Sequence, residues 1–165
     1  MTAVPVLHTA RCTLSAMTQE DIPVLRQILD AADTQSFLPE LCQEFPTAES
    51  LQQFITSFNA YLVQDNGVLW GIRKDETLTG FIAIMDIPNN PTLFYAMHPN
   101  HRNQGYMKEC LARLMDYVHE TKLCDILQTE VYKKNTASHR LLSLFGFEII
   151  DTDASKYDYK KDISE

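Results

Sequence analysis

Apolar side chains in the first third of the chain recur with the spacing of amphipathic helices. Thr18 with Asp21, and later Thr47, are suited to N-cap two such helices. A short strand is expected over residues 11–14, and a loop rich in proline and glutamate over residues 39–46. The predicted helices carry two apolar stripes: Ile22, Leu25, Ile28 and Leu29, and Leu51, Phe54, Ile55 and Phe58.

The pattern changes after the turn signal Asp65-Asn66-Gly67. Three runs rich in β-forming residues follow, separated by residues typical of turns. They predict an antiparallel meander over residues 68–73, 78–87 and 92–97.

Helices and strands alternate in the last third. We expect a helix from about 104 to 122, a strand over 126–132, and a helix over 135–145 that Gly146 ends in a left-handed cap. Two tail segments, 147–151 and 157–160, are expected to close the sheet as a hairpin. Because a strand-helix-strand crossover follows a meander, the order predicts one α/β domain over residues 1–165 with a mixed, mostly antiparallel sheet.

Composition and charge narrow the function classes. The chain has 165 residues, of which 45% are hydrophobic and 22% charged, as is ordinary for a globular domain. The net charge of −8 argues against nucleic acid as a partner and favours a cationic substrate such as an amine. There is neither an apolar run long enough to span a membrane nor a secretory signal, so we expect a cytoplasmic protein.

No metal site is expected. The four cysteines form no CxxC pair and have no histidine at zinc-binding spacing, so they predict reduced, mostly buried thiols. His98 and His101 flank Pro99 without a further ligand, and a place near phosphate suits them better than a metal.

Residues 102–107 stand between a predicted strand and an amphipathic helix. The N-terminus of a helix presents unpaired N–H groups and the positive end of its dipole, which suits phosphate. Gly105 lacks the side chain that would block close approach, and Arg102 can add a charged contact. A glycine at this position also fits plain turn geometry, and the segment matches neither the P-loop nor the dinucleotide fingerprint.

A second segment begins at Glu130, at the end of a predicted strand, and continues into the next helix. Asn135 is a good N-cap for that helix, and Ser138 falls in its first turn. Taken alone, this spacing is equally typical of a capped helix packed on a sheet.

Both segments together resemble the GNAT N-acetyltransferase superfamily. Residues 102–107 are similar to its (Gln/Arg)-x-x-Gly-x-(Gly/Ala) motif, and the later segment to the Asn-x-x-Ser…Gly-Phe signature of the RimJ/RimL-like branch, which acetylates ribosomal-protein N-termini and many small amines. Residues 11–15 and 18–21 also look like that branch. Two positions depart from the pattern: Met107 replaces the usual Gly or Ala, and Leu142 replaces a tyrosine that many members use as an acid.

The resemblance implies the acyl-CoA N-acyltransferase fold, with acetyl-CoA held between residues 92–97 and 126–132. It implies that Glu130 is the base that deprotonates the acceptor amine and that Ser138 lies near the sulfur. Ser138, Tyr132 or water would then replace the missing acid. The implied cofactor-binding residues are Ala96, Met97, His98, Arg102, Asn103, Gln104, Gly105, Tyr106, Met107, Asn135 and Ser138.

Three interpretations stay open. The first is an N-acetyltransferase for a small amine or a peptide N-terminus. The second, favoured by Met107 and Leu142, is a module that binds coenzyme A without turnover. The third, a family member acting on charged tRNA, is disfavoured by the acidic charge. Dimers are frequent in the superfamily, so a homodimer is a further expectation.

Overall fold

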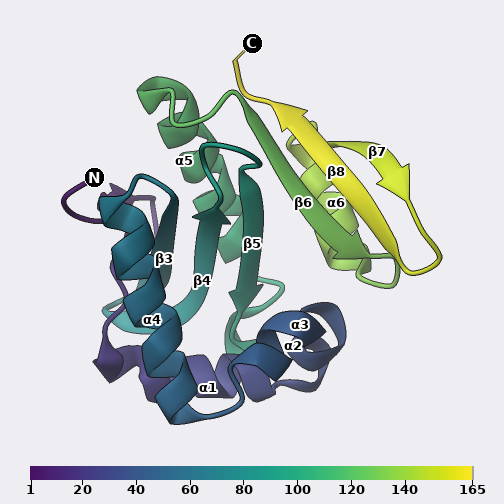
Figure 1. Ribbon diagram of the computed structural model, residues 1–165. Coiled ribbons are helices and arrows are strands. Elements are labelled where there is room, and N and C mark those ends of the chain that lie inside the picture. The colour runs from purple at the N-terminus through teal and green to yellow at the C-terminus, as the bar shows by residue number, and fades with distance from the viewer. Residues whose placement is uncertain (165) are drawn as a thin grey trace.

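Eight strands form one sheet in the computed structural model, which describes residues 1–164 (Figure 1). The strands lie in the order β1-β2-β3-β4-β5-β6-β8-β7, and every neighbouring pair is antiparallel except β5 and β6. Their bounds are β1 Leu7–His8, β2 Thr13–Ser15, β3 Gly67–Lys74, β4 Thr77–Met85, β5 Thr92–Met97, β6 Ile126–Tyr132, β7 Glu148–Thr152 and β8 Lys156–Asp162.

Helices cover both faces of this sheet (Figure 1). In Figure 1, α4 lies in front of the sheet and α1 below it, while α5 and α6 lie behind. Within residues 1–164, no helix is both long and apolar enough to cross a membrane. The bounds are α1 Ile22–Asp30, α2 Ala32–Phe37, α3 Pro39–Glu44, α4 Ala48–Val63, α5 Tyr106–Thr121 and α6 Thr136–Leu144.

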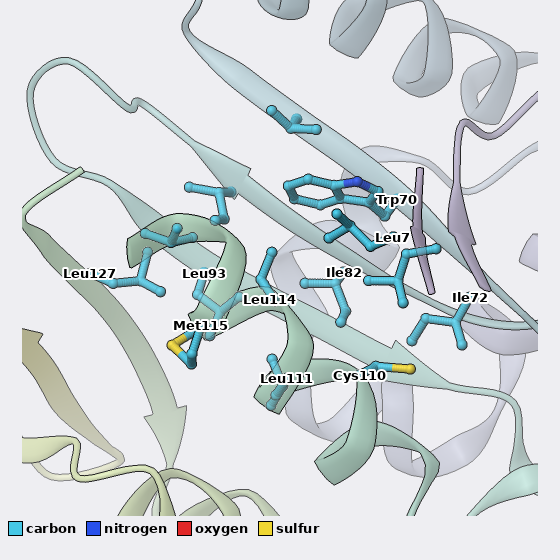
Figure 2. Packing of buried hydrophobic residues seen from close by; sticks show 14 of the residues in the cluster. Leu7, Trp70, Ile72, Ile82, Leu93, Cys110, Leu111, Leu114, Met115 and Leu127 are labelled. Atoms are coloured by element: carbon cyan, nitrogen blue, oxygen red, sulfur yellow. The ribbon is translucent and has the colours of Figure 1, made fainter. Parts of the chain in front are cut away.

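Strand alternation divides the core into two layers. On one face, Trp70 and Ile82 pack with Leu111 and Leu114 of α5, as Figure 2 shows. On the other face, Phe81 belongs to the cluster that includes the apolar stripes predicted for α1 and α4. Since both faces are buried, the central strands are held in place. They therefore fix the position of β5, from which β6 diverges.

The parallel pair β5–β6 is joined only at its start. The register contains one residue pair, Thr92 with Gln128. Next to it, the N–H of Gln128 donates to the carbonyl of Pro91 at 2.8 Å, and the Thr129 hydroxyl donates to the carbonyl of Leu93 at 2.8 Å. Beyond these contacts the two strands diverge (Figure 1).

Several sequence predictions are confirmed. The meander is β3-β4-β5, the tail hairpin is β7-β8, and the bounds of the predicted parallel pair match β5 and β6. Thr18 and Asp21 form a capping box, and Gly146 has φ +80° with the N–H of Phe147 bonded to the carbonyl of Leu142 at 3.0 Å. The four cysteines are free thiols, three of them buried.

The predicted loop over residues 39–46 is wrong. Residues 32–44 form the short helices α2 and α3 instead. Pro39 occupies the first position of α3, where its missing N–H costs nothing, and Glu40 in the first turn favours a helix start. Strand β1, two residues long, is too short to leave a periodic signal.

A buried ion pair ties the start of α1 to the sheet. Arg73 of β3 donates two hydrogen bonds of 2.8 Å to the Asp21 carboxylate, which is 7% exposed. Burial opposes ionisation of Asp21, but the hydrogen bonds from Arg73 and from the Thr18 N–H outweigh it and lower the pKa.

We therefore expect Asp21→Asn to lower the free energy of unfolding by about 2–3 kcal/mol at neutral pH, because it takes from the Arg73 guanidinium its carboxylate partner. A carboxylate with a lowered folded-state pKa contributes stability above the unfolded pKa of about 3.9 and loses it as pH falls through the folded value. Urea unfolding across pH tests this. An unchanged wild-type free energy of unfolding between pH 6 and about pH 2 would contradict it.

Candidate functional site

A cavity of about 330 Å³ lies where β5 and β6 have diverged. Its walls come from α2, β5, the start of α5, β6 and α6. Most of the predicted site residues line it, although they come from three separate parts of the chain. These are Ala96, Met97, Arg102, Asn103, Gly105, Tyr106, Met107, Glu130, Asn135 and Ser138.

Two predicted residues do not line this cavity. The ring of His98 is held on both sides, by Gln27 at 3.0 Å and by the N–H of Asn100 at 3.1 Å. Gln104 is exposed, and its side chain donates to the carbonyl of Asn100 at 3.1 Å. Of the histidine pair, only His101 lines the cavity, and burial together with the nearby His98 and Lys74 lowers its pKa.

The N-terminus of α5 opens into the cavity. Gly105 has φ +81° and Asn103 φ +60°, so the chain makes a left-handed turn before the helix. No side chain caps α5, and its first N–H groups lack intrahelical partners. Among residues 1–164, a Cβ on Gly105 would meet one terminal nitrogen of the flexible Arg11 side chain, at 3.3 Å.

The side chain of Met107 does not project into solvent across this opening. Its side chain is half-buried and packs against the core beneath α5 while also lining the cavity. A larger residue than the usual Gly or Ala is therefore accommodated by the core. Leu142, the other departure, is fully buried and packs in the same core.

Arg102 lies in the cavity wall, where its partners come from α2 and β5. Its guanidinium forms an ion pair with Asp33 and donates to the Thr34 hydroxyl at 3.2 Å and to the Met97 carbonyl at 2.9 Å. This arginine therefore ties α2 to the end of β5. The resemblance alone carried no signal for this arrangement, because Asp33 and Thr34 lie far away in sequence.

Other cations lie at the start of α5. Lys108, in its first turn, lines the cavity. The guanidinium of Arg11 lies 4.4 Å from the centre of the Tyr106 ring, and the Lys74 ammonium lies 5.2 Å from it. The sequence pattern missed all three, because Arg11 and Lys74 reach α5 only through the fold and Lys108 follows no motif.

The main chain of β5 offers backbone groups to the cavity. The carbonyl of Leu93 points toward β6, since the Thr129 hydroxyl of β6 donates to it. Backbone groups of alternate residues in a strand point the same way. The N–H and C=O of Tyr95 and the N–H of Met97 therefore face the divergence, where β6 no longer pairs with them.

The backbone groups of Ala96 point the opposite way, toward β4. The next even-numbered residue, His98, has its N–H bonded to the carbonyl of Thr79 in β4 at 2.7 Å, in agreement with this alternation. Ala96 contributes to the cavity wall. A main-chain donor for a ligand between the strands is thus Tyr95 or Met97.

Two polar side chains from the start of α6 enter the cavity. Asn135 caps α6, its side-chain oxygen accepting from the Ser138 N–H at 3.3 Å, which leaves the amide NH₂ to donate elsewhere. The Ser138 hydroxyl lies 2.7 Å from the Tyr95 hydroxyl. Tyr95 lines the cavity, as does Phe94.

Glu130 lies on the exposed face of β6, across the divergence from Asn135 and Ser138. Its side chain is 64% exposed and lies 3.5 Å from the Lys156 ammonium. Lys156 also bonds Glu40 of α3 at 2.9 Å, and Glu40 accepts from the Tyr132 hydroxyl at 2.8 Å. This network joins α3 to β6 and β8 beside the cavity.

Helix α2 provides the remaining wall. Phe37 and Leu38 at the end of α2 line the cavity together with Asp33 and Thr34. Opposite them stands Phe94 of β5. The cavity thus has a basic end at α5 and an apolar end with carboxylates between α2 and β6.

A family model described as an acetyltransferase (GNAT) domain matches residues 11–148. The uncharacterized N-acetyltransferase YoaA of Bacillus subtilis (strain 168) is 23% identical over 149 residues, which is 87% of this chain and 83% of YoaA.

Two solved structures show the shared fold. A RimL ribosomal alpha-N-protein acetyltransferase in complex with coenzyme A superposes with a TM-score of 0.84 at 14% identity, covering 96% of this chain and 98% of RimL. A putative ribosomal-protein-serine acetyltransferase from Vibrio cholerae gives a TM-score of 0.77 at 19% identity, covering 98% and 99% of the two chains.

Proposed function

Because the chain belongs to the GNAT acetyltransferase family, we propose that its cavity binds acetyl-CoA from the side of α5 and α6 and an amine from the side of α2 and β6. The protein is an N-acetyltransferase, and acetyl-CoA is its acyl donor. The acceptor we propose is the primary amine of a small molecule or of a peptide N-terminus. The observation that carries the proposal is the uncapped start of α5 opening into the space between β5 and β6.

The start of α5 is suited to hold the diphosphate of coenzyme A. The N–H groups between Asn103 and Met107 would donate to its oxygens, with the helix dipole and Lys108 adding positive potential. Further along the cavity, the backbone of Tyr95 and the amide of Asn135 would hydrogen-bond the pantetheine arm. The N–H of Met97 faces the place where the thioester carbonyl would lie, and one such donor is worth about 3 kcal/mol to a developing oxyanion.

Glu130 is the proposed general base. A protonated alkylamine has a pKa of about 10.4, so it must lose a proton before its nitrogen can attack a carbonyl carbon. Glu130 lines the acceptor end of the cavity and is accessible to water, so it can take this proton directly or through a water molecule. The net charge of −8 also favours a cationic acceptor.

The leaving thiolate needs only modest help. A thiol has a pKa of about 8.5, so its anion is a tolerable leaving group without a strong acid. Leu142 stands where many family members have a tyrosine, and it is fully buried in the core. Ser138, which lines the cavity at the start of α6, is the proposed hydrogen-bond donor to sulfur.

Isothermal titration with acetyl-CoA tests the donor half of this proposal. We expect measurable heat and an increase in melting temperature, because a ligand that binds only the folded state stabilises it. No heat and no thermal shift at millimolar acetyl-CoA would reject the proposal. Tight binding with no thiol release across a panel of amines and peptides would instead favour a binding module.

Gly105→Ala should weaken coenzyme A binding about tenfold, because the added methyl group enters the turn that approaches the diphosphate. Gly146→Ala is the matched control, since Gly146 has φ +80° against +81° for Gly105 but does not line the cavity. Both variants should lose about 1 kcal/mol of stability from left-handed strain. Equal affinities of the two variants for coenzyme A would show that the turn does not hold the diphosphate.

Glu130→Gln should lower turnover about 100-fold while leaving the dissociation constant of acetyl-CoA nearly unchanged, because only proton removal is lost. Glu148→Gln is the control, an exposed glutamate on β7 that does not line the cavity. The readout is thiol release at saturating acetyl-CoA. Wild-type turnover in Glu130→Gln would remove this residue from the mechanism.

The homodimer expected from the resemblance stays a prediction. Light scattering of the purified chain should then give twice the chain mass of 18.9 kDa. A mass of one chain at micromolar concentration would contradict it.

A further inference from the structure

The hydrogen bond between Tyr95 and Ser138 crosses the divergence of the two strands. Tyr95 comes from β5, Ser138 from the first turn of α6, and their hydroxyl oxygens lie 2.7 Å apart. Both side chains line the cavity. Ser138 is only 9% exposed, so its hydroxyl has few alternatives for a partner. This contact therefore belongs to the reaction site rather than to the surface.

The direction of the bond follows from the chemistry of the two groups. Burial raises the pKa of Tyr95 to about 12, which keeps the phenol protonated and able to donate. A phenol is a stronger donor than an aliphatic alcohol, because its proton is the more acidic. When Tyr95 donates to Ser138, the hydroxyl hydrogen of Ser138 is free to point elsewhere. The Ser138 N–H is already bonded to Asn135, which fixes the backbone beneath that hydroxyl.

We propose that Tyr95 is a positioning residue that acts through Ser138: its hydroxyl donates to the Ser138 oxygen and thereby directs the Ser138 hydrogen at the sulfur that leaves during acetyl transfer. This inference rests on the proposed function. Two donors in series strengthen each other in a site of low polarity. The chain Tyr95–Ser138–sulfur thus takes over the task of the tyrosine that Leu142 replaces.

Neither hydroxyl gives up its proton in this step. The acceptor nitrogen attacks the thioester carbon, the C–N bond forms, and the C–S bond breaks with its electron pair moving to sulfur. The nitrogen releases two protons, one when the ammonium is deprotonated before attack and one after the C–N bond forms, and both pass through Glu130 or water to solvent. The thiolate, hydrogen-bonded by Ser138, later takes one proton from solvent, so charge and protons balance.

Competing donors are less well placed. The hydroxyl of Tyr132 is bonded to Glu40 at 2.8 Å, on the acceptor side of β6. The side chain of Leu142 carries no donor and lies in the core. Among residues 1–164, Tyr95 and Ser138 are the hydroxyl-bearing pair joined across the gap between β5 and α6.

A double-mutant cycle separates positioning from mere packing. Tyr95→Phe should lower turnover about three- to tenfold at an unchanged KM for acetyl-CoA, the effect of one hydrogen bond. In the Ser138→Ala background, the same substitution should have no further effect. Tyr117→Phe is the control, a half-buried tyrosine that packs on Trp70 outside the cavity. Additive losses in the double variant would overturn the proposal.

A second measurement needs no acceptor. Isotope-labelled coenzyme A bound to the protein reports the pKa of its thiol by NMR titration. A donated hydrogen bond stabilises the thiolate, so the bound thiol pKa should rise by up to about one unit in Tyr95→Phe and in Ser138→Ala. The control Tyr117→Phe should match the wild type.

The outcomes distinguish failure of the proposed function from failure of the role proposed for Tyr95. Absence of coenzyme A binding to the wild type defeats the proposed function itself. Normal binding with the same thiol pKa in wild type and Tyr95→Phe defeats only the role of Tyr95. Thermal unfolding shows whether Tyr95→Phe is folded, and Ser138→Ala removes the same bond from its other end.

Discussion

The site depends on one interrupted hydrogen-bond ladder. β5 and β6 pair at Thr92 and Gln128 and then separate. On the side facing β6, the N–H and C=O of Tyr95 and the N–H of Met97 therefore form no hydrogen bonds with β6. Buried backbone groups need partners, and such an opening is stable only where water or a ligand supplies them. The sheet around it is well anchored: the core packs against both faces, and Thr129 bonds the carbonyl of Leu93 just before the strands part. The divergence is thus a fixed feature of the fold, and a ligand with amide groups can complete the ladder.

The two ends of the cavity have complementary chemistry. At the start of α5, unpaired N–H groups and Lys108 create a positive region suited to a diphosphate. At the other end, the exposed carboxylate of Glu130 lies beside an apolar wall from α2 and β5, which suits a cationic amine with an apolar neighbour. Arg102 contributes to this division, because it binds Asp33 and Thr34 instead of the helix terminus and so holds α2 against β5. In the proposed function, donor and acceptor therefore approach the same point from opposite sides of the sheet.

Local signals made much of this architecture predictable. Runs of β-forming residues identified the meander, capping residues identified the helix starts, and Gly146 marked a left-handed turn that the structure contains. Prediction from the sequence was incomplete where a residue's role depends on a partner that is distant along the chain. Residues 39–44 were expected in a loop although Pro39 begins α3, and the sequence carried no signal for the ion pair between Arg102 and Asp33. Tyr95 resembled an ordinary core aromatic, since only the fold brings Ser138 to its hydroxyl.

A crystal structure with bound coenzyme A is the most direct test of this account. The account predicts the diphosphate on the N–H groups of residues 103–107, the pantetheine arm between β5 and β6, and the sulfur beside Ser138. A diphosphate bound elsewhere, or a pantetheine arm outside the divergence, would contradict the account at its centre.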